Sequence, residues 1–212
     1  MKRRDFSRTL LGSAAAGLTF PALAQGGAPV EGKAYVRLAQ PQPVPAGKIE
    51  VLEFFWYGCP HCNVFEPALE AWVKKLPADV AFKRVPVAFR EEPFAAHQKI
   101  YYTLEALDLV DSLHRKVFYA IHNDRARLDK PADIEAFVKK NGADPVKFME
   151  VYNSFGVQTK AMQARKLAEA YKIDGVPSIG VNGRYYTSGT LAGSAEQSLA
   201  VADHLIKRSR GG

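Results

Sequence analysis

Apolar and polar positions along the chain predict a sheet flanked by helices. Residues 49–56 form a dense apolar and aromatic run, the pattern of a strand buried on both faces. Apolar side chains then recur at helical spacing from Cys62 to Leu76, so a helix is expected directly after this strand, with Pro67 kinking it. Further strands are expected over residues 35–39, 80–87, 178–181 and 184–187.

Between residues 92 and 164 the pattern changes, and one helical segment follows another. Breaks between these helices are expected at Asp111, Lys130-Pro131 and Asn141-Gly142. Asp144-Pro145 favours a helix start, because Asp can cap the helix and Pro suits its first turn. This block therefore predicts a compact helical insertion.

The order of the elements predicts an α/β fold: a mixed sheet flanked by helices and interrupted once by an all-helical subdomain. Asn182-Gly183 separates the last two predicted strands and is typical of a type I′ hairpin turn. Ser194 begins a capping box that favours a final helix. We expect three regions: a cleaved segment over 1–24, the sheet domain over 25–90 and 165–212, and the helical insertion over 91–164.

The first 24 residues have the pattern of a signal peptide. A basic start precedes an apolar stretch that ends in Ala22-Leu23-Ala24, the small-x-small form that signal peptidase accepts. An N-terminal helix of the folded protein is the alternative, and Pro21 would weaken such a helix. Arg3-Arg4-Asp5-Phe6 is similar to the core of a twin-arginine signal, so the export route stays open.

Net charge gives no indication of a nucleic-acid partner. The first 24 residues hold four Lys/Arg and one Asp, which leaves the rest of the chain at +4 of the full-chain +7. These charges are not clustered, and no basic stripe is interleaved with aromatic residues. A solvated surface is the better interpretation, and no nucleic-acid binding is expected.

The two cysteines of the chain, Cys59 and Cys62, lie three residues apart. A disulfide between them closes a very short loop and adds little stability through chain entropy, so the pair suits chemistry better than structure. Structural zinc also uses Cys-x-x-Cys, but it needs four ligands and a second pair is missing. The remaining histidines are scattered, and no metal is expected: His97, His114, His122 and His204.

The Cys-x-x-Cys motif opens a helix after a buried strand, which gives its two sulfurs different environments. Cys59 lies at the helix start, where free amide N–H groups and the helix dipole stabilise a thiolate and lower its pKa. Cys62 lies one turn further in and should be less accessible. Pro60 suits the first turn. His61 either stabilises the Cys59 thiolate, which makes the disulfide more oxidising, or is merely a solvated residue.

Three further features fit redox chemistry and also have ordinary structural explanations. Val176-Pro177 lies between a helix and a strand, and in isolation such a bond is more often trans than cis. Glu53 lies within the buried run, where it either pairs with Lys83 or Arg84 or accepts a proton beneath the cysteines. Four aromatic side chains either belong to the core or rim a groove for unfolded substrate: Phe55, Trp56, Phe89 and Phe94.

Together these motifs resemble the DsbA family of bacterial thiol:disulfide interchange proteins. The resemblance rests on Val51-Leu52-Glu53-Phe54-Phe55, Cys59-Pro60-His61-Cys62, Asn153-Ser154-Phe155, Gly175-Val176-Pro177 and Val181-Asn182-Gly183. It covers most of residues 35–208 and implies a thioredoxin fold with an inserted helical domain. The segment from Arg90 to Pro93 differs from the family pattern.

The resemblance also implies roles for individual residues. Cys59 would be the attacked sulfur and Cys62 the resolving one, His61 would stabilise the thiolate, and Glu53 would move protons for Cys62. Val176-Pro177 would be cis, lie against the disulfide and pair with an extended substrate.

The implied function is a monomeric periplasmic oxidase that needs no cofactor beyond its own disulfide. Its partners would be reduced, unfolded exported proteins as substrates and a DsbB-like quinone-linked membrane protein for reoxidation. The alternatives are a disulfide isomerase or reductase of the same fold, or a non-catalytic binder of unfolded chains. Isomerases of this kind usually carry a dimerisation domain, for which the sequence leaves no room.

Overall fold

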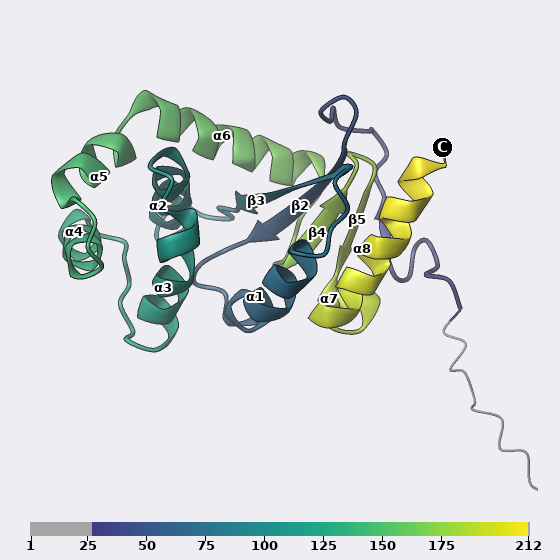
Figure 1. Ribbon diagram of the computed structural model, residues 1–212, viewed down its shortest axis with the longest axis horizontal. Helices are drawn as coiled ribbons and strands as arrows, with labels where there is room; N and C mark the ends of the chain where they lie inside the picture. The colour runs from purple at the N-terminus through teal and green to yellow at the C-terminus, as the bar shows by residue number, and fades with distance from the viewer. Residues whose placement is uncertain (1–26, 212) are drawn as a thin grey trace, which may run out of the picture.

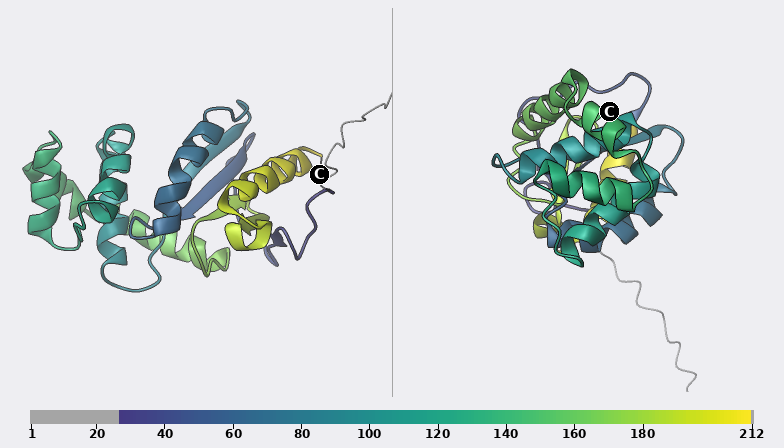
Figure 2. Two further views of the ribbon diagram at one scale, coloured as in Figure 1. Left: turned by 90° about the horizontal axis from the view of Figure 1, so that it is seen from below. Right: turned by 90° about the vertical axis from the view of Figure 1, so that its left-hand side faces the viewer.

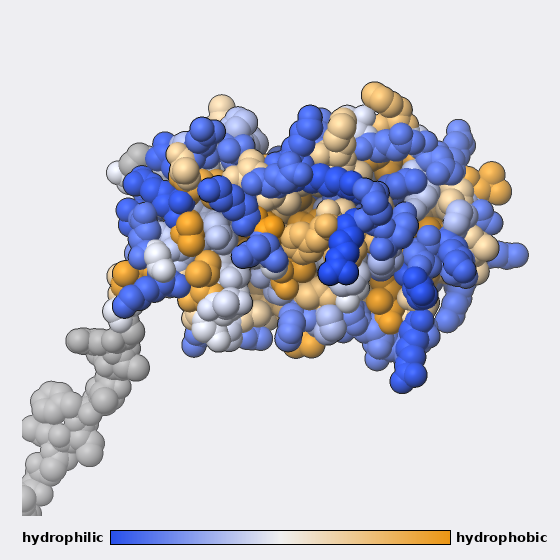
Figure 3. All heavy atoms as spheres, turned by 180° about the vertical axis from the view of Figure 1, so that it is seen from behind, coloured by the Kyte–Doolittle hydropathy of each residue, from blue (hydrophilic) through white to orange (hydrophobic). Residues whose placement is uncertain are grey.

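A computed structural model describes residues 27–211 of the chain. The predicted signal peptide over 1–24 lies outside the described residues. No helix within the described part of the chain is both long enough and apolar enough to cross a membrane. In the face shown in Figure 3, hydrophilic side chains cover most of the surface and apolar ones gather near its middle.

Five strands form one mixed sheet in the order β1-β5-β4-β2-β3. Their bounds are β1 Val36–Arg37, β2 Ile49–Phe55, β3 Val80–Pro86, β4 Ser178–Val181 and β5 Tyr185–Ser188. Strands β2 and β3 are parallel, whereas β4 is antiparallel to both β2 and β5. The turn between β4 and β5 has positive φ angles at Asn182 and Gly183, as the predicted type I′ turn requires.

Strand β2 is buried along its whole length, as predicted, and its two faces pack against different helices. Leu52 and Phe54 belong to the cluster that includes Tyr171 near the end of α6 (Phe155–Ala170). Val51 belongs to the cluster formed with α1 (Pro60–Val73) and α8 (Ala195–Arg210). Because side chains alternate along a strand, Glu53 shares the Val51 face and points toward α1.

Four further helices and α6 lie between β3 and β4. The four helices and the start of α6 form the helical part of the molecule, seen at the left of Figure 1 and from two other sides in Figure 2. They are α2 Phe94–Ala106, α3 Val110–His122, α4 Pro131–Lys140 and α5 Pro145–Tyr152. Asp144 caps α5 through the backbone N–H groups of Val146 and Lys147, as its Asp-Pro start predicted. The arrangement is a thioredoxin fold whose connection between β3 and β4 is expanded by helices.

Some predicted boundaries were wrong. Asp111 does not separate two helices but lies in the first turn of α3, where a carboxylate is favourable near the positive end of the helix dipole. The break occurs just before it, where Asp108 has a φ of 57° and ends α2. A four-residue helix, α7 (Gly189–Ala192), was not predicted and follows β5.

Candidate active site

Cys59 and Cys62 begin helix α1 in a tight arrangement. Cys59 is the N-cap residue and Pro60 is the first residue of the helix. The backbone N–H of Cys62 donates to Cys59 Sγ at 3.3 Å, so the sulfur accepts one of the free amide donors of the helix start. Both residues are free thiols, and their exposed fractions are 7% for Cys59 and 0% for Cys62. Cys59 is therefore the sulfur that an incoming thiolate can reach.

The two thiols have opposite shifts in pKa. The pKa of Cys59 falls from 9.0 to about 6, chiefly because the Cys62 side chain hydrogen-bonds to its sulfur. Burial opposes this fall, while backbone N–H groups of Cys62 and His61 and the charge of His61 add to it. Burial raises the pKa of the Cys62 thiol well above its ordinary value. At neutral pH the pair is therefore a thiolate at Cys59 and a thiol at Cys62.

The loop before β4 lies against Cys59. The Val176-Pro177 peptide bond is cis, as the family resemblance implied and against the usual preference of such bonds. Cys59 Sγ lies 3.4 Å from the carbonyl oxygen of Val176, to which it donates when it is protonated. Ser178 Oγ donates to the carbonyl of Gly175 at 2.8 Å, a hydrogen bond that joins the two ends of this loop. Val176 and Pro177 thus form one wall of the space next to the reactive sulfur.

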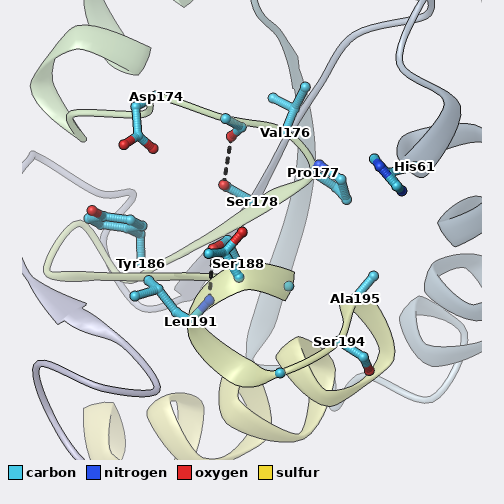
Figure 4. A pocket seen from close by; sticks show the side chains of 14 residues that line it. His61, Asp174, Val176, Pro177, Ser178, Tyr186, Ser188, Leu191, Ser194 and Ala195 are labelled. Carbon is cyan, nitrogen blue, oxygen red and sulfur yellow. Dashed lines mark hydrogen bonds between the residues drawn. The ribbon is translucent and has the colours of Figure 1, made fainter.

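A pocket of about 630 Å³ opens beside this loop and includes His61 in its lining. Figure 4 shows Pro177 next to His61 on one side, with Asp174 and Tyr186 on the other. Ser188, whose hydroxyl accepts from the backbone N–H of Leu191, lies between them. The pocket is continuous with the cysteine motif through His61, so a chain bound at the loop can place a side chain in it.

Glu53 is fully buried and pairs in register with Arg84 on β3, and it lies close enough to Cys62 for its charge to help raise the pKa of that thiol. Arg84 Nε lies 3.2 Å from Glu53 Oε2, whereas Lys83 pairs with Glu50 at 2.8 Å. Of the two predicted partners, Arg84 is therefore the one observed. Burial raises the pKa of Glu53 well above 4.5, the charge of Glu66 raises it further, and Arg84 opposes both effects. The proton-transfer role of Glu53 stays a prediction.

Two residues of this buried cluster were not identified from the sequence. Glu66 is fully buried on α1 and contacts the guanidinium of Arg84. His114, weighed from the sequence only as one of the scattered histidines that show no metal-ligand spacing, has its Nε2 3.3 Å from Glu66 Oε1. The spacing of Glu66, four residues after Cys62 and three before Leu69, places it on the apolar face of its helix and could have marked it.

The aromatic residues divide between the core and the surface. Phe55 is fully buried. The Trp56 ring stacks on that of Phe94 with a centroid distance of 4.0 Å, and Phe89 meets Phe94 edge to face and is 43% exposed. The side chains of Trp56, Phe89 and Phe94 therefore form a partly exposed apolar ridge, while Phe55 is plain core.

Among residues 27–211, no group of three or more His, Cys, Asp or Glu side chains has an arrangement that could hold a metal ion.

Comparisons of the sequence agree with this chemistry. Residues 82–202 match the model of the DSBA-like thioredoxin domain. The chain is 46% identical over 196 residues to the thiol:disulfide interchange protein DsbA of Burkholderia cepacia, covering 92% of this chain and 91% of that protein. It is 44% identical over 180 residues to the protein of the same name from Pseudomonas aeruginosa, covering 84% and 85%.

Solved structures give the same result. The crystal structure of Pseudomonas aeruginosa DsbA superposes with a TM-score of 0.82 at 43% identity, covering 85% of this chain and 94% of that one. The oxidoreductase NmDsbA1 of Neisseria meningitidis superposes with a TM-score of 0.75 at 31% identity, covering 85% and 94%.

Proposed function

Because the chain belongs to the DsbA family and is a thiol:disulfide oxidoreductase, we propose that it donates the Cys59–Cys62 disulfide to newly exported proteins in the periplasm. The observation that carries this direction is the asymmetry of the two sulfurs. A thiolate-forming, reachable Cys59 stabilises the reduced state, and a disulfide whose reduced state is stabilised is a strong oxidant.

In the first step a substrate thiolate attacks Cys59 Sγ. A bond forms between the two sulfurs, the Cys59–Cys62 bond breaks, and its electron pair goes to Cys62 Sγ. Because the pKa of Cys62 is raised by burial, this sulfur takes up a proton as it leaves. The buried Glu53 carboxyl, which keeps its proton to unusually high pH, is suited to supply that proton.

In the second step another substrate thiolate attacks the substrate sulfur of the mixed disulfide. The substrate leaves with a new disulfide, and Cys59 leaves as a thiolate. A leaving thiol of low pKa departs faster, so the pKa of about 6 at Cys59 favours release. The substrate has been oxidised by two electrons and the Cys59–Cys62 pair has been reduced by two.

Substrate binding would use the loop beside Cys59. An extended substrate chain can pair with the backbone at Val176 and Pro177 and place a side chain in the adjoining pocket. Apolar side chains of an unfolded substrate can contact Val64, which is 70% exposed one turn after Cys59, and Phe89. Binding through backbone and apolar contacts suits an enzyme that oxidises many sequences.

The cellular setting follows from the N-terminal pattern and from the redox chemistry. Residues 1–24 would be removed on export, by either route, to leave a monomer with the sheet domain over 25–90 and 165–212 and the insertion over 91–164. Structural and catalytic disulfides persist in the oxidising periplasm. A DsbB-like quinone-linked membrane protein would reoxidise the cysteine pair after each turnover.

The equilibrium of the Cys59–Cys62 pair with glutathione tests the proposed direction. We expect a couple far more oxidising than that of thioredoxin. Glutathione stays protonated below pH 8, and the pKa of Cys59 is about 6. Above pH 6, reduction of the disulfide by glutathione therefore leaves Cys59 as a thiolate and releases one proton, whereas below pH 6 both cysteines keep their protons and none is released. The equilibrium constant for reduction should therefore fall about tenfold between pH 7 and pH 5. A thioredoxin-like potential would overturn the donor role and favour a reductase.

Replacing His61 tests its contribution to the thiolate. In His61→Ala we expect the pKa of Cys59 to rise modestly above about 6 but to stay well below 9.0, because the side-chain and backbone donors of Cys62 remain. The thiolate absorbance of the reduced protein, followed against pH, measures this shift. An unchanged titration would show that His61 is merely a solvated residue, and a return to 9.0 would show that the other donors contribute little.

A further inference from the structure

Two buried carboxyl groups share one guanidinium beneath the cysteines. Arg84 Nε lies 3.2 Å from Glu53 Oε2, and its terminal nitrogen contacts Glu66 Oε1. Both carboxylates are fully buried, and the Arg84 side chain is 14% exposed. Two buried negative charges against one positive charge are unfavourable, so one carboxyl of the pair holds a proton. Which of the two holds it decides whether the proton lies next to Cys62.

His114, on α3, adds a second partner to only one of these carboxyls. Its Nδ1 lies 2.7 Å from the hydroxyl of Tyr57, a fully buried residue just before the cysteine motif. Its Nε2 lies 3.3 Å from Glu66 Oε1. A buried tyrosine whose pKa is raised by burial keeps its proton and donates it to Nδ1, so the proton of the neutral imidazole resides on Nε2 and points to Glu66.

The imidazole of His114 is enclosed by aromatic rings and faces a small set of titratable and charged groups. The rings of Phe55, Tyr101 and Phe118 enclose it edge to face. The titratable and charged groups that face His114 and Glu66 are Glu53 and Arg84 from the sheet, Tyr57 from the turn before α1, Glu70 from α1 and Tyr101 from α2. Burial lowers the pKa of His114, so it acts as a neutral donor.

We propose that His114, oriented by Tyr57, is a positioning residue that keeps Glu66 ionised and thereby places the shared proton on Glu53, next to Cys62. Glu66 Oε1 accepts a hydrogen bond from Arg84 and has His114 Nε2 as a second polar neighbour at 3.3 Å, whereas Glu53 has only the ion pair with Arg84, and neither of its oxygens has a hydrogen-bond partner among the described residues. The directions of the pKa shifts agree, since that of Glu66 is lowered and that of Glu53 is raised.

This inference rests on the proposed role of Glu53. It gives the helical insertion a part in the chemistry, because His114 lies on α3. When the Cys59–Cys62 bond breaks, the proton on Glu53 passes to Cys62 Sγ, and Glu53 is left as a carboxylate beside Arg84. In reoxidation the same carboxylate accepts the Cys62 proton. With the proton on Glu66 instead, Glu53 would have no proton to give when the Cys59–Cys62 bond breaks.

Two matched variants separate this role from packing. Gln in place of His114 can put an amide N–H where Nε2 lies, whereas Asn reaches only the position of Nδ1 and cannot donate to Glu66. The measurement is a pH titration of the glutamate carboxyl carbons by NMR in the reduced protein, with Glu53→Gln and Glu66→Gln for assignment. In His114→Asn we expect the pKa of Glu66 to rise and that of Glu53 to fall, and His114→Gln should restore both.

A kinetic readout completes the experiment. The rate at which glutathione opens the Cys59–Cys62 disulfide should fall about tenfold at pH 7 in His114→Asn and about a hundredfold in Glu53→Gln, with little change in His114→Gln. If His114→Asn does not fold, Tyr57→Phe should shift the two carboxyl titrations in the same directions by freeing the imidazole tautomer.

Unchanged titrations of Glu53 and Glu66 in His114→Asn, or in Tyr57→Phe where that variant replaces it, would overturn the assignment. A normal rate of disulfide opening in Glu53→Gln together with the expected titrations would support the role of His114 in placing the proton. That outcome would at the same time remove Glu53 from the proposed reaction.

Discussion

Replacing Cys59 by Ser should reduce thiol oxidation to the uncatalysed background, whereas Cys62→Ser should accumulate mixed disulfides with its substrates. The difference follows from exposure and pKa. Cys62 is 0% exposed and holds its proton because burial raises its pKa, so it cannot replace Cys59 as the sulfur that meets substrate. Without Cys62, in turn, the mixed disulfide at Cys59 loses the internal thiol that could break it.

The measurement is oxidation of a reduced, unfolded protein by each variant, with adducts detected on non-reducing gels and lost on reduction. The double variant Cys59→Ser, Cys62→Ser serves as the control for non-covalent capture. Adducts on Cys59→Ser, or none on Cys62→Ser, would contradict the division of labour. Full biological activity of the double variant would instead favour a non-catalytic binder of unfolded chains.

The sequence predicted those parts of the fold that depend on local pattern. Strand β2 is buried at all seven positions, so its continuous apolar run was sufficient evidence for it. The cap at Asp144 and the turn at Asn182-Gly183 are likewise set by residues adjacent in sequence. Helix α7 was missed because it has only four residues, flanked by Gly189 and Gly193, and such a segment has no periodicity to detect.

The same distinction explains which site residues were predicted. Cys59, Pro60, His61 and Cys62 form one local motif, whose helical spacing fixes their relative positions. The contact between Glu66 and His114 joins residues 48 positions apart, on two helices whose facing sides are set only by tertiary packing. His114 lies on an apolar helix face, where an ordinary buried histidine has the same pattern. No local signal therefore marked this pair.

Removing Arg84 should cause the largest loss of stability among single substitutions in the cluster. In Arg84→Met the guanidinium that lies over the Phe82 ring is lost, and the carboxylate of Glu66 is left buried with only His114. We expect the free energy of unfolding at pH 7 to fall by about 3 kcal/mol, as when one partner of a buried ion pair is removed. Glu53 should contribute little to this loss, because it already holds a proton.

The pH dependence of that loss identifies its cause. The pKa of Glu66 is lowered in the folded protein, so its ionic contribution is fully present above 4.5 and is lost as the pH falls through the lowered value. Urea unfolding of Arg84→Met, in one redox state of the cysteines, should therefore approach wild-type stability as the pH falls below 4.5. Lys83→Met is the matched control, since Lys83 is 56% exposed and its loss should cost no more than about 1 kcal/mol. A loss that is equal in the two variants, or constant with pH, would show that Arg84 stabilises the protein through packing and not as the counterion of Glu66.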